Sequence, residues 1–250
     1  MYPLHNWILL ITTNGWMMAF SPLPTYKDKT DPWSSHTIIV NWLKRLPEGS
    51  IILDIGTASG TIGRLCNGIG LFRKGIEPNS DWAELARPFY EDFCVSSIEE
   101  AKDEFIENVQ AVILADVLEH TINPGSLLNR IVKLQRSDCI FLISVPNVAN
   151  IWIRINLFFG RFEYSERGIL DRTHLRFFTR SSFIELLKKC NLEIVEFRPT
   201  PIPLYLLHPF FNENSIGRFV SLLFFKTSIL FPTLFGYQFV VLAQMRQIRD

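Results

Sequence analysis

A glycine-containing loop between an apolar segment and a helical pattern is the first feature that could support chemistry. Residues 51–60 read IILDIGTASG, and an apolar helical pattern begins at Ile62. Gly56 and Gly60 would let a ligand approach the backbone closely, and the start of the following helix would offer it free amide groups. The arrangement therefore suits a carboxylate or a phosphate.

Two acidic residues accompany this loop. Asp54 stands near the end of its apolar segment, and Glu77 ends the next one, FRKGIE. Asp54 could orient the loop or meet a ligand ammonium group, and a carboxylate at position 77 can accept both hydroxyls of a ribose. The alternative is that both are solvated acids at strand ends. A dinucleotide fingerprint starting at Gly56 would need glycine where Ala58 and Thr61 stand, which argues against NAD.

A second cluster of reactive side chains lies in ILDRTHLRFF, residues 169–178. Asp171, Arg172, His174 and Arg176 fall within six positions among apolar neighbours. Burying such a cluster is costly unless its members pair, which predicts either a paired structural network or an active site. In an active site, Asp171 would orient His174, a neutral imidazole that can remove the proton of a hydroxyl, and an arginine such as Arg172 would meet an anionic substrate group.

Two further histidines have less specific surroundings. His120 follows Glu119 in a VLEH sequence, where we expect a structural role. His36 either faces an active site or lies at the surface near a helix cap, since Ser34 and Ser35 are both good capping residues. The spacing of histidine, cysteine and acidic residues indicates no metal site.

The elements that must position these residues follow an alternating pattern. From about residue 50, short apolar segments alternate with helical patterns, which predicts a doubly wound α/β fold with a mostly parallel sheet and helices on both faces. The expected strands are 50–55, 72–77, 93–96, 109–116, 139–146, 192–197 and 237–244. Helices are expected after Asn79, Asn123 and Ser182. Residues 147–178 and 201–235 fall outside the pattern, and we expect both segments to cover a substrate site.

The composition fits one domain, expected over residues 31–250 after an extension formed by residues 1–30. Lysine plus arginine (25) equals aspartate plus glutamate (25), so no overall field recruits nucleic acid. The four cysteines contain no CxxC pair, which argues against a disulfide framework. No basic residue precedes Lys27, so the apolar run at 7–11 lacks the basic part of a signal peptide, and a cytoplasmic location is expected.

Taken together, ILDIGTASG, GIEPN (75–79) and ILADVLEHTINP (113–124) resemble the motif series of class I S-adenosylmethionine-dependent methyltransferases. The last motif is especially similar to a bacterial subgroup that includes ubiquinone-type O-methyltransferases and MetW-like proteins. The likeness continues through residues 144–179, which resemble bacterial methyltransferases associated with glycan or secondary-metabolite assembly. It implies a Rossmann-like sheet of seven strands in which the final strand is antiparallel.

The resemblance also implies cofactor-binding roles for eight residues: Asp54, Gly56, Ala58, Gly60, Glu77, Ser97, Ile98 and Asp116. The first four would surround the methionine part of S-adenosylmethionine. Glu77 would hold the ribose, Ser97 and Ile98 would flank the adenine, and Asp116 would lie near the methionyl amine. The family commonly has GCG or GCS at 56–58 and an aspartate near Ser97, so these departures predict a lowered cofactor affinity.

These observations predict methyl transfer from S-adenosylmethionine to a hydroxyl of a sugar, a lipid-linked glycan or a small metabolite, with His174, Asp171 and Arg172 as catalytic residues. Positioning the nucleophile in line with the methyl group supplies the larger part of such catalysis. Two other functions stay open. One is a regulatory module that binds the cofactor without turnover, and the other is an NAD-dependent oxidoreductase.

The apolar stretch FVSLLFFKTSILFPTLF, residues 219–235, is interrupted by Lys226 and Pro232 before about 20 residues accumulate, which argues against a membrane span. Three roles remain for the segment at 215–235. It could cover the core or the acceptor pocket, lie on the inner membrane surface, or join two subunits into a homodimer.

Overall fold

The computed structural model describes residues 7–12, 15–20, 31–204 and 210–246. Within the expected N-terminal extension, β1 (Trp7–Thr12) and β2 (Gly15–Phe20) pair with each other as an antiparallel two-stranded sheet. The rest of that extension, and residues 247–250 of the expected domain, lie outside the described residues.

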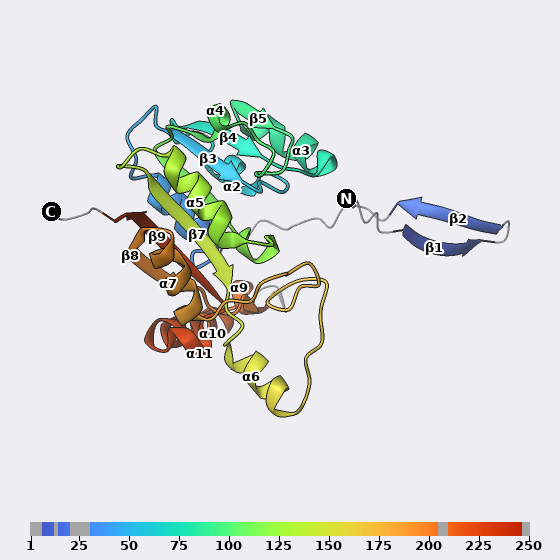
Figure 1. The fold of residues 1–250 in the computed structure, drawn as a ribbon. Helices are drawn as coiled ribbons and strands as arrows, with labels where there is room; N and C mark the ends of the chain where they lie inside the picture. Colours follow the sequence, from blue (N-terminus) through green and yellow to red (C-terminus); the bar gives the residue numbers. More distant parts are fainter. Residues whose placement is uncertain (1–6, 13–14, 21–30, 205–209, 247–250) are drawn as a thin grey trace.

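A seven-stranded sheet forms the centre of the molecule (Figure 1). Its strands are β3 (Ile51–Ile55), β4 (Phe72–Ile76), β5 (Asp92–Cys94), β6 (Ala111–Ala115), β7 (Ile140–Pro146), β8 (Leu192–Pro199) and β9 (Gln238–Met245). They are arranged in the order β5-β4-β3-β6-β7-β9-β8, with β9 antiparallel to both neighbours and the other pairs parallel. The predicted fold class and the antiparallel final strand are therefore confirmed.

Helices cover both faces of this sheet. Successive strand residues point to opposite faces, so each strand contributes side chains to both cores. On one face, Ile52 joins the core made with α1 (Ser35–Leu43) and α2 (Thr61–Leu65). On the other, Leu53 joins the core made with α4 (Asp103–Ile106), α5 (Pro124–Leu134) and α7 (Arg180–Lys189). The continuous apolar character of the central strands follows from this double burial.

Several helices begin directly after a residue whose side chain accepts a hydrogen bond from the free amide groups of the first turn. Ser34 caps α1, Asn79 caps α3 (Ser80–Ala86), and Asn123 caps α5, whose first residue is proline. The prediction for the start of α7 was wrong by one turn. Thr179 is its N-cap and forms a capping box with Ser182, the residue that the sequence pattern assigned to the cap itself.

Two segments depart from the alternating pattern, as the sequence predicted. Residues 147–178 contain α6 (Ile151–Phe158) and a long loop, and α6 leaves the carboxyl end of β7 at the lower end of Figure 1. Residues 201–235 contain α9 (Phe210–Glu213), α10 (Ser215–Leu230) and α11 (Pro232–Phe235), while 205–209 lie outside the described residues. Among the helices that the structure describes, none has the length and mean hydropathy of a transmembrane span.

Two buried asparagines tie the end of β7 to the start of β9. The Asn147 side-chain amide donates to the carbonyl oxygens of Thr233 at 2.9 Å and Gly236 at 2.8 Å, and its oxygen accepts from the amide of Ala149 at 3.0 Å. The Asn150 amide adds a second bond to Gly236 at 2.9 Å. Both asparagines are fully buried, so they fix the point at which the 147–178 segment leaves the sheet.

Asn147→Ala should destabilise the chain by at least about 2 kcal/mol, because it removes three hydrogen bonds made by a fully buried side chain. Denaturant unfolding measures the change. The matched control is Asn129→Ala on the exposed side of α5, which should change the free energy of unfolding by no more than about 0.5 kcal/mol. Equal effects of the two substitutions would show that the asparagine hub contributes little.

Candidate active site

The carboxyl ends of four adjacent parallel strands carry most of the predicted cofactor residues. The loop at 56–60 follows β3, Glu77 follows β4, Ser97 lies beyond β5 and Asp116 follows β6. Because these strands are neighbours in the order β5-β4-β3-β6, their loops lie along one edge of the sheet. The crevice outside the carboxyl ends of such strands is where open α/β sheets bind ligands.

The loop at 56–60 is held to the neighbouring strand β4 by backbone hydrogen bonds. The amides of Gly56 and Thr57 donate to the carbonyl oxygen of Ile76 at 2.8 and 3.2 Å. Gly56, Ala58 and Gly60 all have left-handed φ angles, of 71°, 46° and 77°. Glycine adopts this conformation freely, whereas Ala58 does so at a cost of about 1 to 2 kcal/mol.

Gly60 is required by protein packing. A Cβ at this position would lie 2.8 Å from the Cα of Ala86 in α3 and 3.0 Å from the ring of Phe89. This packing requirement adds to the reason given by the sequence, a close ligand approach, which stays a prediction. The loop and α3 approach each other too closely for any side chain, and a larger residue at position 60 would push α3 away.

Asp54 lies beneath the loop, with only 2% of its surface exposed. Its carboxylate accepts a hydrogen bond from the hydroxyl of Tyr90, and that hydroxyl in turn accepts one from the amide of Gly63 in α2. Burial raises the pKa of Asp54 to about 7, the nearby Glu77 charge adds to the increase, and the bond from Tyr90 opposes it. Through Tyr90 the carboxylate of Asp54 is connected to the start of α2, and both roles predicted for Asp54 stay predictions.

Glu77 is 7% exposed and connects the loops after β3 and β4. Its carboxylate accepts hydrogen bonds from the backbone amides of Ala58 at 2.8 Å and Asn79 at 3.0 Å. Burial raises the pKa of Glu77, and these two bonds oppose the increase. A carboxylate has about four acceptor sites, so two remain for ribose hydroxyls.

Asp116 ends β6 in a left-handed conformation with a φ of 57°. One carboxylate oxygen accepts from the hydroxyl of Ser144 at 2.6 Å, and the other accepts from the amide of Gln238 at 2.7 Å. The nearby Tyr237 hydroxyl is affected by the same charge. Burial, together with the charges of Asp116 and Asp171, raises the pKa of Tyr237 to about 12, so the phenol stays protonated.

The segment after β5 is clamped by Arg130 from α5. Its guanidinium donates to the carbonyl oxygens of Ile98 at 2.6 Å and Ala101 at 2.7 Å, and to the carboxylate of Asp103 at 2.6 Å. Ile98 is buried in the core, and the hydroxyl of Ser97 accepts from the amide of Glu100 at 3.3 Å. The residues predicted to flank an adenine therefore stand on a fixed loop.

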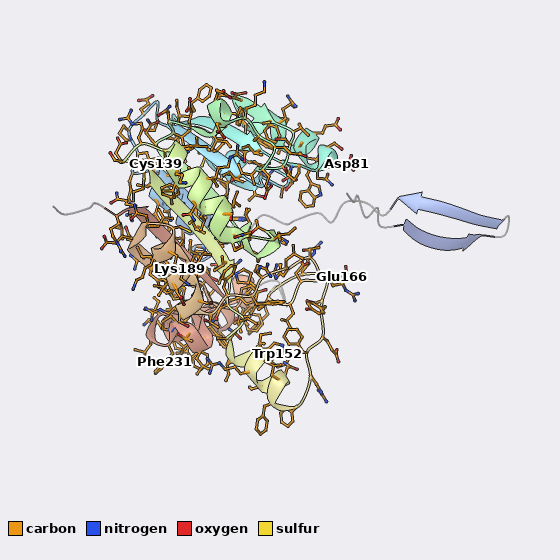
Figure 2. All side chains as sticks on the ribbon, viewed as in Figure 1. Asp81, Cys139, Trp152, Glu166, Lys189 and Phe231 are labelled. Carbon is orange, nitrogen blue, oxygen red and sulfur yellow. The ribbon has the colours of Figure 1, made fainter. Side chains whose placement is uncertain are left out.

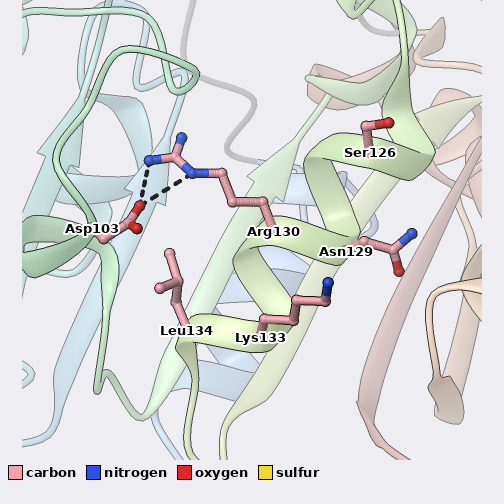
Figure 3. A pocket seen from close by; sticks show the side chains of 6 residues that line it. All are labelled: Asp103, Ser126, Asn129, Arg130, Lys133 and Leu134. Carbon is pink, nitrogen blue, oxygen red and sulfur yellow. Dashed lines mark hydrogen bonds and ion pairs between the residues drawn. The ribbon is translucent and has the colours of Figure 1, made fainter.

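Arg130 and Asp103 also line a surface pocket on the outer side of α5, together with residues that include Asn129 and Lys133 (Figure 3). The Arg130 guanidinium is engaged by Asp103 and by backbone oxygens, so its charge is used to hold the loop. This pocket contains none of the strand-end residues, and we assign it no catalytic role.

The loop carrying His174 folds back onto the end of β6. The amides of Leu175 and Arg176 donate to the carbonyl oxygen of Glu119 at 2.7 and 3.0 Å, and the guanidinium of Arg176 donates to the carbonyl oxygen of Ile122. These bonds place the ring of His174 against that of His120, with centroids 4.8 Å apart in an edge-to-face arrangement. Burial and the neighbouring His174 lower the pKa of His120, which favours its neutral form.

The partners expected within this cluster differ in the structure. Asp171 was predicted to orient His174, but its carboxylate accepts from the amide and hydroxyl of Thr173 at 2.8 and 2.6 Å. The Nδ1 of His174 lies 3.0 Å from the carbonyl oxygen of Ile169 instead. Hydrogen bonds to residues close in the sequence therefore occupy the Asp171 carboxylate and Nδ1 of His174, in place of a bond between the two side chains.

Arg172 forms an exposed ion pair with Glu166 at 3.1 Å. His36 stands in the first turn of α1 and is half-buried. Sequence reasoning missed Glu119, which is 1% exposed and lies beside both His120 and His174. An acidic residue directly before a histidine at a strand end was the available signal.

Comparison with known proteins adds a family assignment to this geometry. A family model described as a methyltransferase domain matches residues 36–197. No curated protein matches the chain.

Three solved structures illustrate the likeness in fold. A SAM-dependent methyltransferase from Archaeoglobus fulgidus is 16% identical, with 84% of this chain and 94% of that chain covered and a TM-score of 0.55. The 1,6-didemethyltoxoflavin N1-methyltransferase of Burkholderia thailandensis, bound to S-adenosylhomocysteine, is 18% identical, with 85% and 77% covered and a TM-score of 0.54. Magnesium protoporphyrin IX methyltransferase from Synechocystis, also with bound S-adenosylhomocysteine, is 13% identical, with 85% and 82% covered and a TM-score of 0.53.

The ionisation of Asp54 should make stability depend on pH. Because burial raises its pKa to about 7, Asp54 favours folding while it is protonated, and this contribution is lost as the pH rises from about 4 through about 7. Asp54→Asn removes the ionisation, so its free energy of unfolding should increase relative to the parent between about pH 4 and about pH 8. Denaturant unfolding across this range measures the difference. A difference that stays constant with pH would contradict the prediction.

Glu77→Ala should weaken binding of S-adenosylhomocysteine by roughly tenfold or more, which corresponds to at least about 1.4 kcal/mol. The substitution removes the predicted acceptor for the ribose and the bond that fixes the amide of Ala58. Calorimetric titration measures the affinity. The control is Glu193→Ala on the exposed side of β8, which should bind as the parent does. An affinity of the Glu77 variant within twofold of the parent would refute its role.

Proposed function

Because the chain belongs to the methyltransferase domain family, we propose that it transfers the methyl group of S-adenosylmethionine to a hydroxyl of a sugar, a lipid-linked glycan or a small metabolite. The cofactor would lie across the strand-end loops. Glu77 would hold the ribose, Ser97 and Ile98 would flank the adenine, and Asp116 would lie near the methionyl amine. The loop at 56–60 would contact the methionine part.

One observation carries the assignment of the acceptor side. Two backbone hydrogen bonds to the carbonyl oxygen of Glu119 bring the loop that carries His174 close to the end of β6. Asp116, the last of the predicted cofactor residues, directly follows this strand. This position supports a role for His174 as the base, because Glu119 follows Asp116, the residue predicted to lie near the methionyl amine, by three positions. This is the arrangement that a hydroxyl nucleophile requires, because its proton must leave as it attacks.

The reaction has a simple balance of bonds. The hydroxyl oxygen attacks the methyl carbon, the carbon–sulfur bond breaks, and its electron pair returns to sulfur to give S-adenosylhomocysteine. The proton of the hydroxyl passes to Nε2 of His174. Since Nδ1 of His174 lies 3.0 Å from a carbonyl oxygen, which only accepts, Nδ1 carries the ring hydrogen and Nε2 is free to take the proton.

An acceptor with a lipid portion is supported by apolar side chains on the segment that leads to His174. On α6, Trp152 is 64% exposed and Phe158 is 82% exposed, and Figure 2 shows Trp152 at the lower end of the molecule. Basic residues stand among them, including Arg154 and Arg161. Exposed aromatic side chains next to positive charges suit the boundary of an anionic membrane.

His174→Ala should keep its affinity for S-adenosylhomocysteine and lose roughly 10²- to 10⁴-fold in turnover, the usual contribution of a positioned base. Turnover is followed as S-adenosylhomocysteine formed with a panel of hydroxyl-bearing acceptors, and affinity by calorimetry. Normal turnover of the variant would remove His174 from the mechanism. A parent protein that binds the cofactor but methylates no acceptor would instead identify a binding module without turnover.

A further inference from the structure

Three side chains with metal-binding atoms converge at the end of β6. Glu119 and His120 come from the short 3₁₀ helix at Leu118–His120, and His174 comes from the loop that docks on it. One ligand atom from each residue lies within 4.8 Å of the other two. The histidines are far apart in the sequence, and backbone bonds to Glu119 bring them together.

The hydrogen bonds of both imidazoles leave the same nitrogen available. Nδ1 of His120 lies 3.3 Å from the carbonyl oxygen of Thr173, and Nδ1 of His174 lies 3.0 Å from that of Ile169. The Thr173 hydroxyl also lies 3.2 Å from Nδ1 of His120, but it donates its hydrogen to Asp171. A carbonyl oxygen only accepts, so each Nδ1 carries the ring hydrogen and each Nε2 has a lone pair. Histidines that bind metals typically donate their second ring N–H in this way, which fixes the orientation of the ring.

The cluster faces solvent on one side. The Glu119 side chain is 1% exposed, whereas His120 is exposed, so the cluster has a closed inner side and an open outer side. Bonds of about 2.1 Å in tetrahedral geometry place ligand atoms about 3.4 Å apart, so the cluster would need to close by at most about 1.4 Å. Small adjustments shared among the three side chains would supply a movement of this size.

We propose that Glu119, His120 and His174 bind one divalent transition-metal ion on the acceptor side of the active site. Two imidazole nitrogens and one carboxylate suit Zn²⁺, Co²⁺ or Fe²⁺, whereas Mg²⁺ and Ca²⁺ prefer oxygen ligands. The sequence spacing alone indicated no metal site. The proposal that an ion binds depends only on these three residues. The role of the ion beside the acceptor rests on the proposed function.

A bound ion would change how the acceptor hydroxyl loses its proton. Three protein ligands leave at least one position open, and a divalent ion lowers the pKa of an oxygen that it binds. The hydroxyl proton would then pass to solvent water, because the Nε2 lone pair of His174 is used by the ion. His174 therefore acts as a base in the metal-free protein or as a ligand in the metal-loaded protein, but not as both.

Metal binding is tested directly on the full chain after treatment with a chelator. Titration with Zn²⁺ or Co²⁺, followed by calorimetry and by the visible spectrum of Co²⁺, should show one ion per chain, and Mg²⁺ should bind at least about tenfold more weakly. His120→Ala and Glu119→Gln should each weaken Co²⁺ binding by about tenfold or more, as for the loss of one ligand. Because His120 is exposed, its variant should keep the fold of the parent. Glu193→Gln, at an exposed site on β8, is the matched control and should bind as the parent does.

The outcomes separate this inference from the proposed function. Less than one ion per chain, or unchanged Co²⁺ binding in both variants, would overturn the metal site. Binding of S-adenosylhomocysteine is measured on the same metal-free samples, so a protein that binds the cofactor but no metal would keep the proposed function and lose the inference. Full turnover of the metal-free protein would also contradict a role for the ion and would favour His174 as the base.

Discussion

The parallel pairing of β5, β4, β3 and β6 is the constraint on which the rest of the molecule depends. Parallel strands that are neighbours bring their carboxyl ends to one edge, and every loop that follows them must begin there. The pairing is stabilised by burial on both faces, where Ile52 and Leu53 enter opposite cores. The site is thus a consequence of how the apolar strands are buried.

At that edge, the chain satisfies its buried carboxylates mainly with its own donors. Glu77 accepts two backbone amides, Asp54 accepts the hydroxyl of Tyr90, and Asp116 accepts from Ser144 and Gln238. An unpaired carboxylate in such a position would cost several kcal/mol, so these bonds are a condition for burying the charges. They also fix the loops before any ligand arrives, which lowers the cost of ordering them on binding.

The proposed acceptor side is built differently, by a long segment that returns to the sheet. Asn147 anchors the start of this segment at the end of β7, and the amides of Leu175 and Arg176 attach its later part to Glu119. The segment that carries His174 is therefore held by hydrogen bonds near both of its ends. Residues between these anchors can vary without disturbing the strand-end loops, as is common for loops on a rigid scaffold.

The sequence by itself determined the fold class, the seven strands to within about two residues, and the strand-end positions of Gly56, Glu77 and Asp116. Apolar periodicity and loop glycines are local properties, so they can be recognised in the sequence alone. It did not determine the cap of α7, the packing reason for Gly60, or the partners of Asp171 and His174. Each of these depends on which groups meet in space. The packing of α3 decided the contact at Gly60, and hydrogen bonds to nearby side chains and backbone groups decided the others. The convergence of Glu119, His120 and His174 belongs to the same class, because only the return of a distant loop onto β6 places three ligand atoms within reach of one ion.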